Sequence, residues 1–271
     1  MNAPRAGTIE NAIASAPRHF VIRLRETEFV LIQTVCVTVM VAASIDMAVL
    51  AQADRDSAAP REPRVVAESR FVVTNAPAQT DLVQLVVDFE PRAWTSLHTH
   101  GGQAINLVLE GEITLRHGGM DRPYKAGQSW TDSTSQVHAA GNTGSGKARL
   151  LTNFLLPKGA PQITVVQESQ FGPAVTYEAK FPLPSLATET EIVQQVIDLP
   201  PGWRTERAYH GFAAGLIVDG EVTHRIGPDR KSYKPGDAWM AQAGTVVTEE
   251  NNTPKRARVF RSYLVRKGAT P

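Results

Sequence analysis

Residues 91–112 read PRAWTSLHTHGGQAINLVLEGE, and this stretch contains the pattern on which the fold prediction depends. His98 and His100 are separated by one residue, so on a β-strand both side chains point to the same face. Two imidazoles at this spacing can bind one metal ion. Gly111 follows His100 by eleven residues and ends an aliphatic run that is typical of a buried strand.

A second stretch further along the chain supplies a third histidine. Gly127 and Trp130 precede His138, and Asn142 follows it. Short runs rich in β-branched and aliphatic residues surround both stretches, and glycines separate these runs at the spacing of hairpins. No segment after residue 64 shows a sustained helical period. The sequence therefore predicts an all-β protein made of short strands in sandwiches or barrels.

The two stretches together resemble the paired motifs of the cupin superfamily. The first motif is formed by His98, His100 and Gly111, and the second by Gly127, Trp130, His138 and Asn142. The resemblance implies an RmlC-like jelly-roll barrel, also called a double-stranded β-helix, with one divalent metal inside. It assigns His98, His100 and His138 as the metal ligands.

One position departs from the cupin pattern. The resemblance implies a glutamate ligand four residues after His100, but the sequence has Ala104 there. The neighbouring Gln103 could supply a carbonyl oxygen, although on a strand it would face the other way unless Gly101–Gly102 rotates it. We expect either three histidines alone or the same three with Gln103. Such a neutral set leaves the ion its full +2 charge, which favours an anionic substrate or hydroxide.

The expected cofactor is one divalent transition metal. Imidazole ligands suit Fe, Mn, Zn, Ni and Cu and do not select among them. The resemblance implies a metal-dependent enzyme acting on a small oxygenated organic substrate, as a dioxygenase or as a decarboxylase, lyase or isomerase. The alternative is a cupin that binds a small molecule or metal without catalysis. The metal content of the purified protein would discriminate between the two.

The chain after residue 64 contains an internal repeat. The tetrapeptide ending at Gly127 recurs as the tetrapeptide ending at Gly236, which sets the offset at 109 residues (236 − 127). This period is too long for a solenoid and indicates two copies of one domain. The sequence predicts tandem cupin-type barrels, an N-terminal one at residues 65–160 that holds the metal site and a C-terminal one at residues 161–271.

The second copy lacks the histidine set. With a one-residue slip, the alignment places His98 on Ala208, His100 on His210 and His138 on Val247. One histidine cannot hold a metal tightly, so the second copy is expected to be a degenerate cupin. Glu206, Tyr209 and His210 could form a polar cluster at its mouth, but a solvated loop is the favoured interpretation.

The first 64 residues differ in composition from the rest. Residues 29–45 form an uncharged apolar run, and the small residues Ala51 and Ala53 precede a change to charged and proline-rich sequence. This pattern favours a signal peptide or membrane-associated leader at residues 1–53 and a linker at 54–64. The expected localisation is periplasmic or secreted. Open alternatives are an uncleaved anchor, a buried element and a true translation start further downstream.

The overall composition excludes several classes. Lys plus Arg is 28 and Asp plus Glu is 27, so the net charge of +1 gives no electrostatic footprint for nucleic acid. Cys36 is the sole cysteine, which excludes an internal disulfide and a cysteine-rich zinc site. The expected partner is a small-molecule substrate or ligand, and a homodimer is left open.

Overall fold

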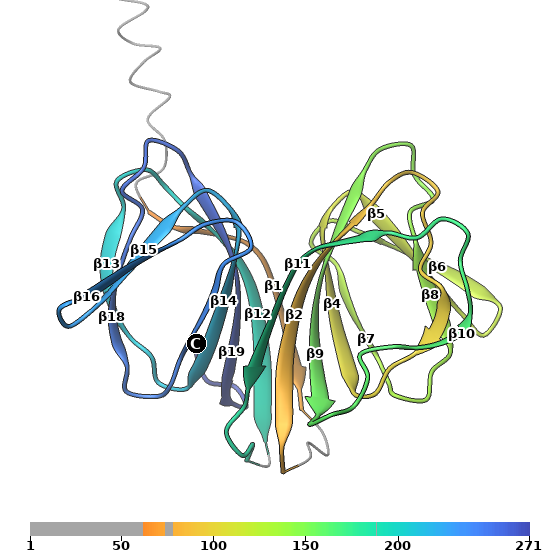
Figure 1. Cartoon of the computed structure of the whole chain (residues 1–271), viewed down its shortest axis with the longest axis horizontal. Coiled ribbons are helices and arrows are strands. Elements are labelled where there is room, and N and C mark those ends of the chain that lie inside the picture. Colours follow the sequence, from red (N-terminus) through yellow and green to blue (C-terminus); the bar gives the residue numbers. More distant parts are fainter. Residues whose placement is uncertain (1–61, 74–77, 188) are drawn as a thin grey trace, which may run out of the picture. The chain divides into compact units, whose positions relative to one another are not determined.

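The computed structural model describes residues 62–73, 78–187 and 189–271, which form 19 β-strands (Figure 1). Within these residues no helix occurs, and accordingly none that could cross a membrane. The strands build two antiparallel barrels, so the predicted all-β class with two jelly-roll barrels is confirmed. The predicted leader at residues 1–53 and nearly all of the predicted linker lie outside the described residues.

The N-terminal barrel is formed by two five-stranded sheets. One sheet has the strand order β10 (Thr164–Gln167), β3 (Leu97–Thr99), β8 (His138–Gly141), β5 (Glu112–His117) and β6 (Met120–Lys125). The other has the order β11 (Ala174–Pro182), β2 (Thr80–Phe89), β9 (Ala148–Pro157), β4 (Gln103–Glu110) and β7 (Ser129–Asp132). Facing sheets of this kind enclose a space lined by every second side chain.

The C-terminal barrel repeats this plan with a five-stranded and a four-stranded sheet. The larger sheet has the order β1 (Arg64–Val72), β12 (Thr190–Leu199), β19 (Ala257–Arg266), β14 (Phe212–Asp219) and β17 (Ala238–Ala241). The smaller has the order β13 (Arg204–Ala208), β18 (Val246–Glu250), β15 (Val222–Ile226) and β16 (Asp229–Tyr233).

The two barrels do not correspond to two successive halves of the chain. Strand β1 pairs antiparallel with β12 and so belongs to the C-terminal barrel, whereas β10 and β11 pair with β3 and β2 of the N-terminal barrel. The predicted boundary between residues 160 and 161 does not coincide with this pairing. The similarity between the two repeats does not reveal this exchange of edge strands. Main-chain hydrogen bonds hold an edge strand in its sheet, and they do not depend on which side chains the strand carries.

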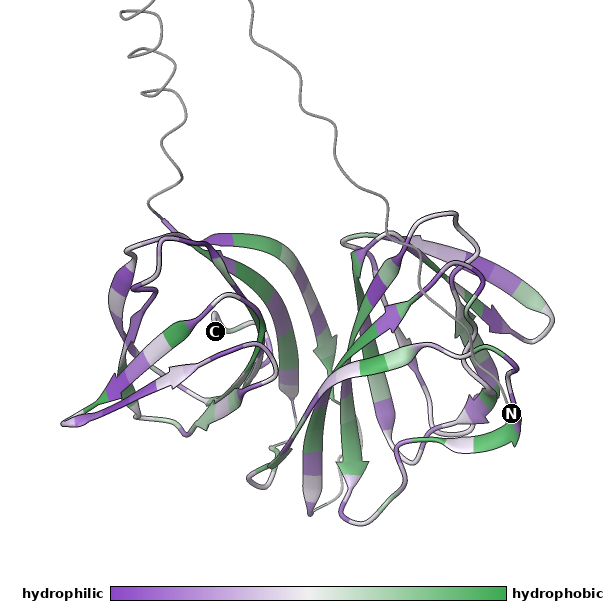
Figure 2. Ribbon diagram, turned by 45° about the horizontal axis from the view of Figure 1, so that its top comes forward, coloured by the Kyte–Doolittle hydropathy of each residue, from purple (hydrophilic) through white to green (hydrophobic). Residues whose placement is uncertain are grey.

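Apolar side chains line the interior of each barrel and also pack between two sheets, the one that contains β2, β4 and β9 and the one that contains β12, β14 and β19. The inter-sheet clusters combine residues of both barrels, including Leu107 and Leu151 with Leu216 and Phe260. In Figure 2, hydrophobic segments recur along the long strands of both these sheets. The same interface holds buried polar bonds, since Gln84 and Asn153 both donate to the Ser262 hydroxyl, at 2.8 and 2.7 Å.

Strand pairing corrects the repeat alignment at the histidines. His98 lies opposite His138 in the first barrel, and Arg207 lies opposite Val247 in the second. Arg207 is therefore the counterpart of His98, and at the same offset Tyr209 replaces His100. The expected correspondence of His98 with Ala208 and of His100 with His210 is wrong by one residue. The slip applies to β2 and β12, where Asp88 and Asp198 pair with corresponding arginines, and the register returns before β13.

Candidate metal centre in the N-terminal barrel

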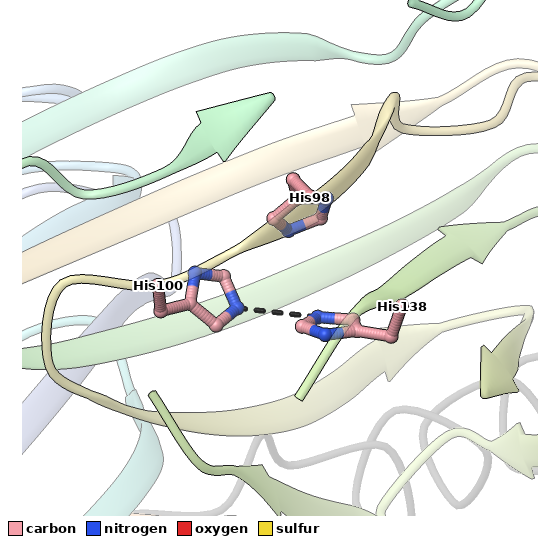
Figure 3. Close-up of side chains that lie close together, drawn as sticks. All are labelled: His98, His100 and His138. Carbon is pink, nitrogen blue, oxygen red and sulfur yellow. Dashed lines mark hydrogen bonds between the residues drawn. The ribbon is translucent and has the colours of Figure 1, made fainter. Parts of the chain in front are cut away.

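Two neighbouring strands bring the three predicted histidines together. His98 lies on β3 and His138 begins β8, and these two residues are paired across the strands. His100 follows β3, where Gly101 and Gly102 turn the chain towards β4. A Cβ on Gly102 would lie 2.0 Å from the carbonyl oxygen of Leu155, so the turn needs glycine here. The three rings converge inside the barrel (Figure 3), with centroids 4.5–4.8 Å apart.

Backbone carbonyl groups fix the orientation of each ring. The Nδ1 atoms of His98, His100 and His138 lie 2.6, 3.0 and 2.9 Å from the carbonyl oxygens of Ser96, Gln162 and Gln136. A carbonyl oxygen only accepts, so Nδ1 carries the proton in each ring and Nε2 keeps a free lone pair. The Nε2 atoms of His100 and His138 are 3.2 Å apart. Two lone pairs at this distance repel each other unless a cation or a proton lies between them.

Burial favours the neutral form of His98 and His100. All three residues are at most 7% exposed. Burial lowers the pKa of His100 to about 4, with the neighbouring His138 and His98 adding to the effect, and burial also lowers the pKa of His98. Neutral imidazole is the form that binds metal ions. The candidate ligand atoms of the three residues all lie within 4.8 Å of one another.

A cavity of about 300 Å³ opens from the histidines through the barrel interior. Its wall is largely apolar, with Val87, Phe89 and Leu150 on one side and Trp130 and Phe154 among the aromatic members. Its polar members besides the histidines are Thr95, Ser96, Asn106, Asp132, Thr152 and Gln162. Among the described residues that line it, none is a lysine or an arginine.

Gln103, the predicted fourth ligand, does not join the histidines. It does not line the cavity, and it starts β4, on which Asn106 faces the cavity. Because side chains alternate along a strand, Gln103 shares its face with Ile105, which packs in a cluster with residues of the C-terminal barrel. The glycines that precede Gln103 do not rotate it inwards. The fourth position at the histidines is therefore not filled by this amide.

Sequence reasoning missed a buried carboxylate beside the histidines. Asp132 ends β7 and is 2% exposed. Its Oδ2 lies 3.5 Å from Nε2 of His138 and 3.9 Å from Nε2 of His100. The same oxygen accepts hydrogen bonds from Asn106 at 2.8 Å and from Trp130 at 3.0 Å. The spacing Trp130-x-Asp132 on one strand could have indicated that both side chains face the interior.

The C-terminal barrel replaces the histidine cluster with a buried ion pair. Arg261 on β19 and Glu249 on β18 are fully buried, and the guanidinium Nη2 donates to the carboxylate Oε1. His224 contacts the same oxygen at 3.1 Å. Burial by itself would raise the pKa of Glu249, but Arg261 and His224 outweigh it and lower the pKa to about 2. His210 is exposed and lies outside this cluster. The buried charged groups of the C-terminal barrel therefore interact with each other.

Comparisons with known proteins agree with this architecture. Residues 85–154 match the family model of the cupin domain. Over 85 residues the chain is 33% identical to the HTH-type transcriptional regulator PuuR of Escherichia coli. The matched segment is 31% of this chain and 46% of that protein. The chain thus spans less than half the length of this curated relative.

Three solved structures are similar to this chain at low sequence identity. AerE from Microcystis aeruginosa is 16% identical and covers 76% of this chain and 100% of its own, with a TM-score of 0.48. YhaK from Escherichia coli is 16% identical, with coverages of 74% and 94% and a TM-score of 0.47. Oxalate decarboxylase from Bacillus subtilis is 13% identical, with coverages of 77% and 75% and a TM-score of 0.48.

The fold and the cluster define a protein of two jelly-roll barrels with a three-histidine centre in one of them. Residues 85–154, which lie in the N-terminal barrel and contain the three histidines, match the cupin domain that the motifs predicted.

Proposed function

We propose that the N-terminal barrel holds a single divalent transition metal and acts on a small oxygenated organic molecule. The observation that carries the proposal is the convergence of three buried Nε2 lone pairs, each fixed by a carbonyl on the other side of the ring. A hydrogen bond from the ring nitrogen that does not face the metal is typical of metal-ligating histidines. The donor set fits Fe, Mn, Zn, Ni or Cu, because imidazole binds all of these ions.

The contribution of the protein itself would be to position the metal ligands and the substrate and to exclude water from the site. A divalent cation bound here would act as a Lewis acid on an oxygen atom of the substrate. His98, His100 and His138 sit on one wall of the barrel, which leaves the opposite side of the site open to the cavity. Phe154 packs at a centroid distance of 4.9 Å against His100 and restricts its ring. The apolar wall keeps bulk water from the reacting atoms.

The cavity indicates the chemical class of the substrate. A space of about 300 Å³ with an apolar wall suits a small molecule that has a hydrocarbon or aromatic body. Its oxygen atoms would be directed to the histidine end, where the polar side chains gather. A dioxygenase reaction and a decarboxylase, lyase or isomerase reaction are both consistent with such a site.

A second candidate is a binding domain without catalysis. The observation that favours it is the similarity of 85 residues to a protein named as a transcriptional regulator rather than as an enzyme. In this function the same cavity would take up a small ligand and release it unchanged.

Metal analysis of protein purified without chelator tests the proposal. We expect about one equivalent of transition metal per chain in the wild type, and its loss in His98→Ala and His138→Ala. His210→Ala, which changes an exposed histidine outside the cluster, is the matched control and should retain the metal. Equal metal content in all four proteins would contradict the assignment. Incubation of the loaded protein with small acids, phenols and diketones, followed by mass spectrometry, then separates catalysis from binding.

A further inference from the structure

We propose that Asp132 is the carboxylate ligand of this metal centre, an inference that rests on the function proposed above. The cupin resemblance places a glutamate at position 104, where this chain has alanine. The structure supplies a carboxylate from another strand instead. Asp132 lines the same cavity as the three histidines, and its side chain is 2% exposed.

The strand register explains how Asp132 reaches the site. Ala104 on β4 and Asp132 on β7 are direct partners across the two strands. Ala104 belongs to the apolar cluster inside the N-terminal barrel, so its Cβ points to the interior. Directly opposed side chains lie on the same face of a sheet, about 4.5–5.5 Å apart at Cβ. A carboxylate at 132 therefore reaches nearly the same place as one at 104.

The distances fit ligands of one ion. Two ligand atoms that each lie about 2.1 Å from a metal are roughly 3.0–3.4 Å apart in octahedral or tetrahedral geometry. Nε2 of His138 lies 3.2 Å from Nε2 of His100 and 3.5 Å from Oδ2 of Asp132. The remaining distance, from Oδ2 to Nε2 of His100, is 3.9 Å. Shifts of up to about half an ångström bring these three distances among Asp132, His100 and His138 into this range.

The environment of the second carboxylate oxygen of Asp132 supports the assignment more strongly than the distances do. Oδ2 accepts two hydrogen bonds, from Asn106 and Trp130, and these hold the carboxylate in place. Oδ1 is buried, and within the part of the chain that the structure describes no group donates a hydrogen bond to it. A buried carboxylate oxygen without a donor costs free energy, because it has lost water and gained nothing in exchange. A cation bound to this carboxylate, beside the imidazoles of His100 and His138, would compensate for the missing donor.

The residues at the corresponding positions of the C-terminal barrel support the assignment of Asp132 as a ligand. The register pair that corresponds to Ala104 and Asp132 is Ala213 and Ala241. The histidine positions of that barrel hold Arg207, Tyr209 and Val247. The carboxylate is therefore absent from the barrel in which the histidines are absent, as expected if they serve one ion.

Asp132 also changes the expected charge of the site. Three neutral imidazoles and one carboxylate leave a divalent ion with a net charge of +1 instead of +2. No lysine or arginine lines the cavity among the described residues, so no other fixed cation is available to a substrate there. A neutral or singly charged molecule thus suits the site better than a multiply charged anion does.

Titration of the metal-free protein with Co²⁺, followed by calorimetry and by visible absorption, tests the role of Asp132. Asp132→Asn keeps the size of the side chain and removes its charge, and Asp132→Ala removes the ligand. We expect both to weaken Co²⁺ binding by more than about 100-fold, beyond the usual 10–100-fold cost of losing an outer contact. The d–d absorption should also change, because the ligand set changes. Gln103→Ala, the control, should match the wild type in both measurements.

A relocated carboxylate gives a further test. Ala104→Glu combined with Asp132→Ala should recover Co²⁺ affinity relative to Asp132→Ala, because the two positions share one face. If this double variant does not fold, Asp132→Asn alone decides. A Co²⁺ spectrum that is unchanged in Asp132→Asn would overturn the proposal, whatever its affinity. Failure of the wild type to bind Co²⁺ would instead overturn the metal centre itself, so the two failures are distinguishable.

Discussion

The buried ion pair of the C-terminal barrel gives the sharpest stability prediction. Glu249→Ala leaves the Arg261 guanidinium fully buried without a counter-charge, and it also removes the partner of His224. Breaking a buried pair by removing one partner costs about 3–5 kcal/mol. For a protein of this size, each kcal/mol lowers the Tm by about 2–4 °C, so a decrease of about 6–20 °C is expected.

The pH dependence of the same pair has a definite sign. The pKa of Glu249 is lowered in the folded state, to about 2 from an ordinary value of 4.5. A carboxyl group with a lowered pKa stabilises the fold above its unfolded pKa, and this contribution is lost as the pH falls from about 4.5 towards 2. Glu249→Ala should therefore lose less stability than the wild type over that acid range.

Differential scanning calorimetry of three variants provides the assay. Asp121→Ala is the control, because Asp121 pairs with Arg116 through two bonds of 2.8 Å on the exposed surface, where water screens the interaction. Replacing both partners, Glu249→Leu with Arg261→Met, should recover most of the Tm, because no unpaired charge remains. The reasoning is refuted if the Tm of Glu249→Ala falls no further than that of Asp121→Ala.

Three further predictions concern other parts of the chain. Gly141→Ala places a Cβ 2.1 Å from the ring of Trp94 and should destabilise the N-terminal barrel by about 1–3 kcal/mol, measured by urea unfolding. In the control Gly146→Ala the new Cβ meets no atom within 4 Å, so the free energy of unfolding should not decrease in this way. Chelation of the proposed metal should lower the Tm, since an ion at 1,000 times its Kd stabilises the fold by about 4 kcal/mol; an equal Tm with and without added metal would contradict it. We also propose export with cleavage after Ala53, for which N-terminal sequencing should find a mature chain that begins at Asp54, and an intact Met1 would exclude it.

The sequence predicts the fold class and the three histidines, because these depend on local signals. The His-x-His spacing places two rings on one face of a strand, and the repeat offset reveals a second domain. Asp132 could not be predicted in the same way, since its place beside His138 depends on the register between β4 and β7. The alternative of three histidines with Gln103 required the preceding glycines to rotate its side chain, because adjacent residues on a strand face opposite ways.

The buried charges of the C-terminal barrel were also beyond sequence reasoning. Glu249 and Arg261 are charged residues on strands, and most such residues are exposed to solvent. Each compensates the charge of the other inside the barrel, and no local sequence signal indicates that pairing. The expected solvated loop holds for His210, which is exposed, but Tyr209 is buried in the barrel core and Glu206 lies on strand β13.

The placement of β1 has a consequence for the order in which the protein forms during synthesis. Strand β1 leaves the ribosome first, but its partner β12 lies roughly 120 residues later, which at about 5–20 residues per second means a delay of several seconds or more. All strands of the N-terminal barrel are completed within that interval. The N-terminal barrel can therefore fold as a contiguous unit while β1 remains unpaired, and the C-terminal barrel is completed last, after the N-terminal barrel has folded.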